Sequence, residues 1–301
     1  DPYFKFIEMG YSITFYEAWF GSILYAFQLY FDFSGYTDMA LGLALMFGII
    51  LPINFFSPFK SKNISEFWSC WHITLSNLVR NYIYYPLSLS LNRICASYNL
   101  NSFFSFILGI SIPTIIAFFC IGFWHGAGWN FIIFGLINAF YLIVYNFWTL
   151  FKNYLNISYK NNIFTSIASQ LLTFLSIVVA LVFFRSSDFN NAIAYIKFLF
   201  GANGLQLNDI FQKGLMGANP LNGLTWLIIC SVIIFFLPNT QEAIFYKIRN
   251  KFNRNNFITK KFSIFNLKWK PNLFYLIIIL SIFIISLMKI GKENEFIYFQ
   301  F

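Results

Sequence analysis

The sequence predicts an all-α membrane protein that crosses a bilayer about seven times. Composition is the first reason, because 58% of the 301 residues are hydrophobic and only 10% are charged, which exceeds the apolar share of soluble domains. The second reason is that the apolar residues gather in runs long enough to form spanning helices. We therefore expect a single membrane-embedded domain over residues 1–301, with interfacial or re-entrant helices between the spans.

Two short apolar runs open the chain. Residues 19–31 are short for a bilayer that needs about 20 residues, which predicts a helix that is tilted, re-entrant or extended upstream. This run ends in an aromatic turn that contains Asp32 and Asp38, and residues 39–56 form the second run. Judged alone, carboxylates in such a turn favour a helix-capping role.

Residues 57–101 are mixed in polarity and contain no run of spanning length, which predicts an interfacial or re-entrant segment. Asn63, followed three residues later by Glu66, is typical of a capping box at a helix start. A helix from about residue 64 would place His72 beside one apolar face. That face would contain Phe67, Trp71 and Leu75.

Five further apolar runs complete the predicted spans, and Pro113 is expected to kink the first of them. These runs are residues 103–123, 131–150, 166–184, 221–237 and 272–288. Residues 189–200 predict an amphipathic helix, and the Asn- and Gly-rich sequence up to residue 219 predicts a surface loop.

The net charge of +9 arises partly in one basic loop, residues 238–271, which the positive-inside rule predicts to be cytoplasmic. No basic and aromatic groove is visible, so nucleic-acid binding is not expected. Counting spans back from this loop places the hairpin at His125 on the outer side and the segment at His72 on the inner side.

Metal, disulfide and targeting signals are not found in the sequence. The four cysteines are scattered without metal-ligand spacing, and the two histidines have no i, i+3 or i, i+4 partners, so neither a metal site nor a bound cofactor is expected. The chain begins with Asp1 and shows no signal-peptide pattern. We expect that N-terminal spans of a longer protein precede it.

Both histidines directly follow a tryptophan, and they are the first functional candidates. An ionisable side chain at membrane depth costs on the order of a few kcal/mol, so His125, in a Gly-rich break between two runs, is a candidate general base. The alternative is a histidine hydrogen-bonded at a helix end. His72 would handle a second proton or orient substrate, or it is an interfacial histidine beside an aromatic belt.

Several ordered stretches carry a family resemblance: residues 29–40 (LYFDFSGYTDMA), 67–76, 122–126 (GFWHG) and 296–301. The chain resembles the membrane-bound O-acyltransferase (MBOAT) family, most closely its alginate O-acetyltransferase membrane-subunit branch, which is related to the D-alanyl transfer protein of teichoic acid synthesis. The resemblance implies that His125 is the active-site histidine, that His72 is a second motif histidine, and that both face a tunnel. Substrate-binding roles are expected for Trp71, Ser76, Arg80, Trp124 and Asp38.

The function implied by the resemblance is acyl transfer at a bacterial inner membrane. An acetyl or other acyl group would pass from a cytoplasmic thioester donor, such as acetyl-CoA, to a hydroxyl of an extracytoplasmic polysaccharide or peptidoglycan. A periplasmic partner resembling a serine hydrolase would finish the transfer.

Three positions depart from the family pattern. Asn81 stands where the family often has Asp, residues 88–93 replace a Gly-Gly-Asn-Arg pattern, and Asn138 stands where His is frequent. A rival hypothesis is a transporter or flippase in which the histidines relay protons, although no inverted repeat is visible. A third is that this stretch of chain is inactive alone.

Overall fold

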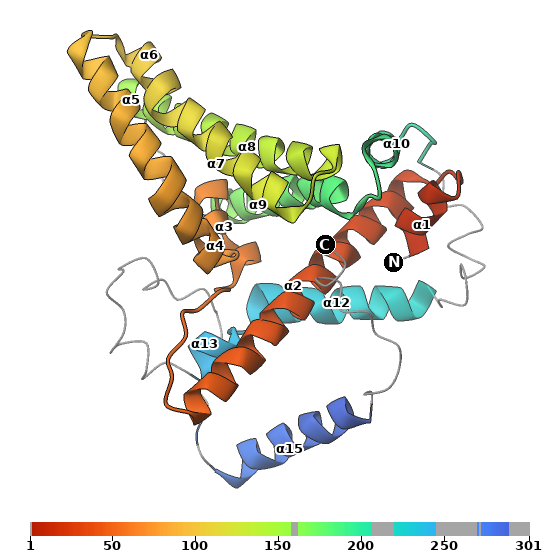
Figure 1. Cartoon of the computed structure of the whole chain (residues 1–301). Coiled ribbons are helices and arrows are strands. Elements are labelled where there is room, and N and C mark those ends of the chain that lie inside the picture. Colours follow the sequence, from red (N-terminus) through yellow and green to blue (C-terminus); the bar gives the residue numbers. More distant parts are fainter. Residues whose placement is uncertain (1, 158–161, 206–219, 245–269, 271, 289–301) are drawn as a thin grey trace.

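A computed structural model describes residues 2–157, 162–205, 220–244, 270 and 272–288. Every regular element in these ranges is a helix (Figure 1), which confirms the all-α prediction. The basic sequence at 245–269, the loop at 206–219 and the C-terminal residues 296–301 lie outside the described residues.

The first predicted apolar run and the start of the second, up to Met46, form one helix, which corrects the prediction of two spans. After α1 (Pro2–Glu8), α2 runs from Phe15 to Met46, straight through the predicted aromatic turn. Its first turn is capped by Thr14 and Glu17, whose side chains bond to each other's backbone N–H groups, so capping by Asp32 or Asp38 was wrong. Because residues 32–38 contain no proline, nothing in them forces a helix end.

Short helices follow in the mixed segment. They are a 3₁₀ turn (Pro58–Lys60), α3 (Ile64–Cys70), α4 (Ile73–Val79), a π-helical turn (Arg80–Tyr84) and α5 (Tyr85–Ser97). Asn63 caps α3 as predicted by accepting the Glu66 N–H at 2.8 Å. The Glu66 carboxylate accepts from the Lys62 N–H and not from that of Asn63, so only half of the predicted capping box is confirmed. The helix is interrupted at Trp71 and His72, so the prediction of one continuous apolar face was wrong.

Among the residues that the structure describes, three helical stretches are long and apolar enough to cross a membrane: Ser102–His125, α8 (Trp129–Tyr154) and α9 (Ile163–Arg185). The first consists of α6 (Ser102–Phe106), a π-helical turn (Ile107–Ser111) and α7 (Ile112–His125). Two shorter apolar helices, α12 (Pro220–Phe236) and α15 (Leu273–Leu287), match the last two predicted runs. The predicted count of about seven spans is therefore confirmed only in part.

Pro113 lies two residues after the end of the π-helical turn. A proline cannot donate to the carbonyl four residues earlier, which here belongs to Gly109. The Ser88 hydroxyl of α5 donates to that carbonyl instead. Residues 88–93, which depart from the family pattern, lie within the helix α5. Helix α5 packs along the stretch from 102 to 125 as an antiparallel arm (Figure 1).

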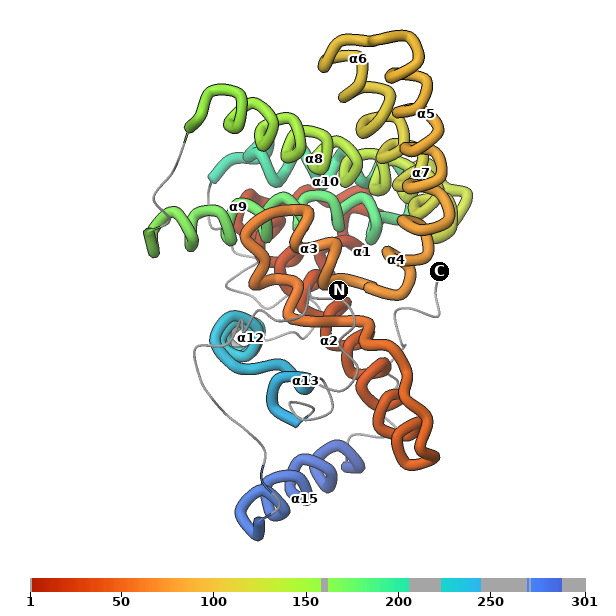
Figure 2. The backbone as a smooth tube through the Cα atoms, turned by 90° about the vertical axis from the view of Figure 1, so that its left-hand side faces the viewer, coloured from red at the N-terminus to blue at the C-terminus, as the bar shows by residue number. Residues whose placement is uncertain are grey.

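Helices α7 and α8 form the tightest pair, joined by the short turn at residues 126–128. A Cβ atom at Gly135 would lie 2.2 Å from the Phe118 carbonyl oxygen, and one at Gly122 would lie 2.4 Å from the Phe131 carbonyl oxygen. Small residues thus let the two backbones touch. Helix α9 packs beside α8, and α10 (Phe189–Leu199) crosses α9 and α2, as Figures 1 and 2 show.

Candidate active site

His72 owes its orientation to the break between α3 and α4. Its backbone is left-handed (φ +43°), a conformation uncommon for a residue with a Cβ atom. Asn54, from the chain after α2, holds the break: its carbonyl oxygen accepts from the Ile73 N–H at 2.9 Å, and its side-chain Oδ1 accepts from the Thr74 N–H at 3.3 Å. The break therefore turns His72 out of the helical path.

The protonation of His72 follows from the same contact. The Thr74 N–H is a donor, so the Asn54 atom that faces it is the amide oxygen. That oxygen lies 3.1 Å from Nδ1 of His72, so Nδ1–H donates and the lone pair of the neutral ring is on Nε2. Burial lowers the pKa of His72 to about 4, which keeps the ring neutral at pH 7.

His125 is the last residue of α7. The helix stops there because Gly126 lets the chain pass close to α8: a Cβ at Gly126 would lie 2.8 Å from the Phe131 ring. The imidazole meets the Phe184 ring of α9 edge to face, with centroids 4.9 Å apart. Three helices thus fix the position of His125.

One small cavity, of about 20 Å³, is lined by both histidines. The Trp124 ring also links them, since its centroid is 6.0 Å from that of His72 and 4.8 Å from that of His125. The span count predicts that the two histidines approach a common tunnel from opposite sides of the membrane, and in the structure both line this one cavity. Their neighbours there are apolar: Leu29, Phe33, Trp68, Trp71, Leu75, Ile121, Phe134, Leu181 and Phe184.

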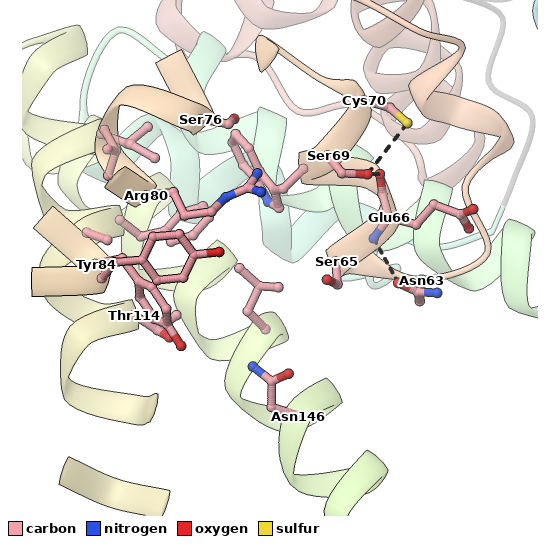
Figure 3. Close-up of a pocket in the computed structure, with 17 residues that line it drawn as sticks. Asn63, Ser65, Glu66, Ser69, Cys70, Ser76, Arg80, Tyr84, Thr114 and Asn146 are labelled. Atoms are coloured by element: carbon pink, nitrogen blue, oxygen red, sulfur yellow. Dashed lines mark hydrogen bonds between the residues drawn. The ribbon is translucent and has the colours of Figure 1, made fainter. Parts of the chain in front are cut away.

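A larger pocket of about 630 Å³ adjoins the small cavity, and Trp68 and Ile121 line both. Figure 3 shows the guanidinium of Arg80 extending into the larger pocket, with the Tyr84 hydroxyl beside it. Both residues lie on the π-helical turn between α4 and α5. Other polar side chains around the pocket are Asn63, Ser65, Glu66, Ser69, Ser76, Thr114 and Asn146.

Three of the five predicted substrate-binding residues line these two cavities, and a fourth, Trp124, lines neither but contacts both histidine rings. Trp71 lines the small one, Ser76 and Arg80 line the large one, and Trp124 contacts both imidazoles. Asp38 lines neither, and its carboxylate accepts from the Gln241 side chain of α13 (Thr240–Ala243) at 2.8 Å. Leu29 and Phe33, earlier in the same helix α2, line the small cavity instead.

Sequence reasoning missed three contributors to the site: Asn54, Phe184 and Asn138. In the sequence, Asn54 is a single amide near the end of an apolar run, and Phe184 is one of 43 phenylalanines. Neither position carries a pattern that predicts a role at the site. Asn138 was noted as a departure from the family pattern, and in the structure its Oδ1 accepts from Nε1 of Trp68 at 3.3 Å. Within the described ranges, no group of three His, Cys, Asp or Glu side chains gathers as a metal site would require.

Known proteins show clear similarity to this chain. A family model for MBOAT, the membrane-bound O-acyltransferase family, matches residues 3–186. A peptidoglycan O-acetyltransferase of Helicobacter pylori is 40% identical over 213 residues, which are 70% of this chain and 37% of that protein. A probable alginate O-acetylase AlgI of Pseudomonas putida is 30% identical over 295 residues, which are 95% of this chain and 53% of that protein.

A more distant relative is a teichoic acid D-alanyltransferase of Streptococcus thermophilus, 30% identical over 184 residues, which are 58% of this chain and 42% of that protein. The chain therefore spans about half or less of the length of each of these relatives. The matched family segment includes both histidines and the two cavities that they and Arg80 line.

Proposed function

The chain belongs to the membrane-bound O-acyltransferase family, and we propose that the protein of which it forms a part transfers an acetyl group to a hydroxyl of an extracytoplasmic polysaccharide or of peptidoglycan. The observation that carries the proposal is the meeting of His72 and His125 in one small, apolar cavity. Membership of a transferase family also favours this reaction over the transporter alternative.

In the proposed reaction His125 is the general base. An unprotonated ring nitrogen of His125 takes the proton of the acceptor hydroxyl as its oxygen attacks the carbonyl carbon of an acyl thioester. The new C–O bond forms, the C–S bond breaks, and the departing thiolate receives the proton from the imidazolium. The cavity contributes by holding the reacting atoms about 3–3.5 Å apart and away from water.

His72 is proposed to orient the reacting groups. Its ring is neutral and its Nδ1–H is engaged by Asn54, so the ring presents a defined tautomer to the cavity. A neutral imidazole beside His125 also avoids a second positive charge when His125 takes up the proton.

The larger pocket is proposed to receive the carrier of the acyl group. Its polar lining suits a hydrophilic carrier, and the Arg80 guanidinium is a strong partner for phosphate oxygens such as those of coenzyme A. The donor is thus proposed to be acetyl-CoA or another acyl thioester that reaches the site from the cytoplasm.

The acceptor class is inferred from the names of the relatives, one of which is named for peptidoglycan and another for alginate. We place the reaction in a bacterial inner membrane, with a periplasmic partner of the serine-hydrolase type completing the transfer.

The test is His125→Ala in the full-length protein, expressed in cells that lack the endogenous copy. The rate at which O-acetyl groups are added to the envelope and secreted polysaccharide is expected to fall at least about 100-fold, because a general base is lost. Phe119→Ala is the matched control, since Phe119 is on the same helix, is partly exposed and lines neither cavity. Normal O-acetylation at normal levels of the His125→Ala protein would contradict the proposal.

A further inference from the structure

Trp68 and Ile121 form the wall that the larger pocket shares with the cavity of the two histidines, and the indole of Trp68 is the larger of the two side chains. We propose that Trp68, fixed by Asn138, restricts the transferred group to the two-carbon acetyl group. This inference rests on the proposed acyl transfer and adds the residue pair that selects the length of the acyl chain.

The indole of Trp68 is held on several sides. Only 7% of the residue is exposed, and its ring meets Phe118 of α7 edge to face with centroids 4.9 Å apart. Phe67 packs against it at 5.6 Å with the ring planes at 90°. The Nε1–H donates to Oδ1 of Asn138 at 3.3 Å. Aromatic contacts and a hydrogen bond thus define one orientation of the indole.

Asn138 is placed specifically for this role. It is fully buried in the middle of α8, where an amide without partners costs free energy. Its Nδ2 donates to the Phe134 carbonyl at 2.8 Å, which leaves Oδ1 facing Trp68. Phe134 itself lines the small cavity and contacts His125, so the hydrogen bonds connect the indole to the wall around the base.

The sizes of the two spaces set the selectivity. The small cavity of about 20 Å³ has room for one or two water-sized groups, which corresponds roughly to the methyl of an acetyl group whose carbonyl carbon faces His125. The further methylene groups of a longer chain would have to displace the large apolar side chains that line the cavity, among them Trp68, Trp71 and Phe134. Removing the indole would widen this cavity towards the 630 Å³ pocket, with Ile121 left as the shared wall.

The experiment is a competition between acetyl, propionyl and butyryl thioesters of the same carrier, with the full-length protein in proteoliposomes. For Trp68→Ala, the ratio of propionyl to acetyl transfer is expected to rise about tenfold or more over wild type, since one methylene in an apolar pocket is worth that much discrimination. Asn138→Leu, which frees the indole, is expected to shift the ratio in the same direction by a smaller factor.

Leu142→Ala is the matched control, because Leu142 lines the larger pocket but not the small cavity. Truncating its side chain should leave the ratio of propionyl to acetyl transfer unchanged. If Trp68→Ala does not accumulate, Trp68→Phe gives the same readout with a smaller ring. An unchanged ratio in the Trp68 and Asn138 variants, with acetyl transfer retained, overturns the inference, as does a wild type that transfers propionyl as readily as acetyl. A wild type that transfers no acyl group from any thioester overturns the proposed function itself.

Discussion

A single amide, Asn54, determines how His72 meets the small cavity. Its side-chain oxygen accepts hydrogen bonds from Thr74, just after the helix break, and from the imidazole of His72. The same amide therefore fixes both the left-handed turn and the tautomer of the ring. Such a residue acts through another side chain and need not touch substrate. Its effect should therefore appear in the rate of chemistry more than in substrate binding.

Asn54→Leu is expected to lower kcat by about tenfold or more with little change in KM, because the orienting hydrogen bond to His72 is lost. Steady-state acyl transfer by the purified full-length protein measures both constants. Asn54→Gln keeps an uncharged amide acceptor and should retain more of the rate than Asn54→Leu. A rise in KM with kcat intact would instead indicate a role in substrate binding.

The burial of His72 also makes stability depend on pH. Its pKa is about 4 in the folded protein and about 6.5 when unfolded, so the unfolded chain binds more protons between these values. The contribution of the neutral ring is complete above pH 6.5 and is lost as the pH falls towards 4. We expect the Tm in detergent to drop over this range by more in wild type than in His72→Gln, and equal drops would contradict the assignment.

At the scale of helices, the contact between α7 and α8 sets the position of His125. Gly122 and Gly135 allow the two helices to touch. The contact fixes α7, and His125 is the last residue of that helix. A side chain placed between the two backbones would push α7 away from α8 and α9. The site would then lose the Phe184 and Phe134 contacts of the imidazole.

Gly135→Ala is expected to destabilise the protein by about 1–3 kcal/mol, because its Cβ would meet a backbone carbonyl that cannot rotate away. Thermal unfolding in detergent, followed by tryptophan fluorescence, measures the change. Gly42→Ala is the control, since nothing lies within 4 Å of that Cβ position in α2 and the helix should gain slightly in stability. Similar Tm values for the two variants would contradict this account of the contact.

The end of α2 is a helix boundary that is set by the backbone conformation of one glycine. Gly48 adopts φ +73°, and the Ile49 N–H reaches back to the Ala44 carbonyl, which closes the helix in a Schellman arrangement. In the sequence, residues 39–56 form one apolar run that continues past this glycine. Its role at the helix end depended on a backbone conformation that composition does not reveal.

For the molecule as a whole, the site lies where helices from distant parts of the sequence converge. The histidines are supported by α2, α3, α7, α8 and α9, which all contribute to the cavity wall. At the other extreme, α15 lies at the edge of both views and none of its residues is buried (Figures 1 and 2). The catalytic proposal therefore depends on the first 185 residues more than on the C-terminal helices.

The sequence by itself determined the all-α membrane class, the long apolar helices near residues 103–184, the cap at Asn63 and the two tryptophan–histidine pairs as candidates. Apolar run length and capping chemistry are local properties, so they can be read along the chain. Only the tertiary structure decided that α2 is continuous, that His72 leaves its helix, and that Trp68 meets Asn138. These features depend on contacts between residues far apart in sequence, whose free energies are settled by packing rather than by local pattern.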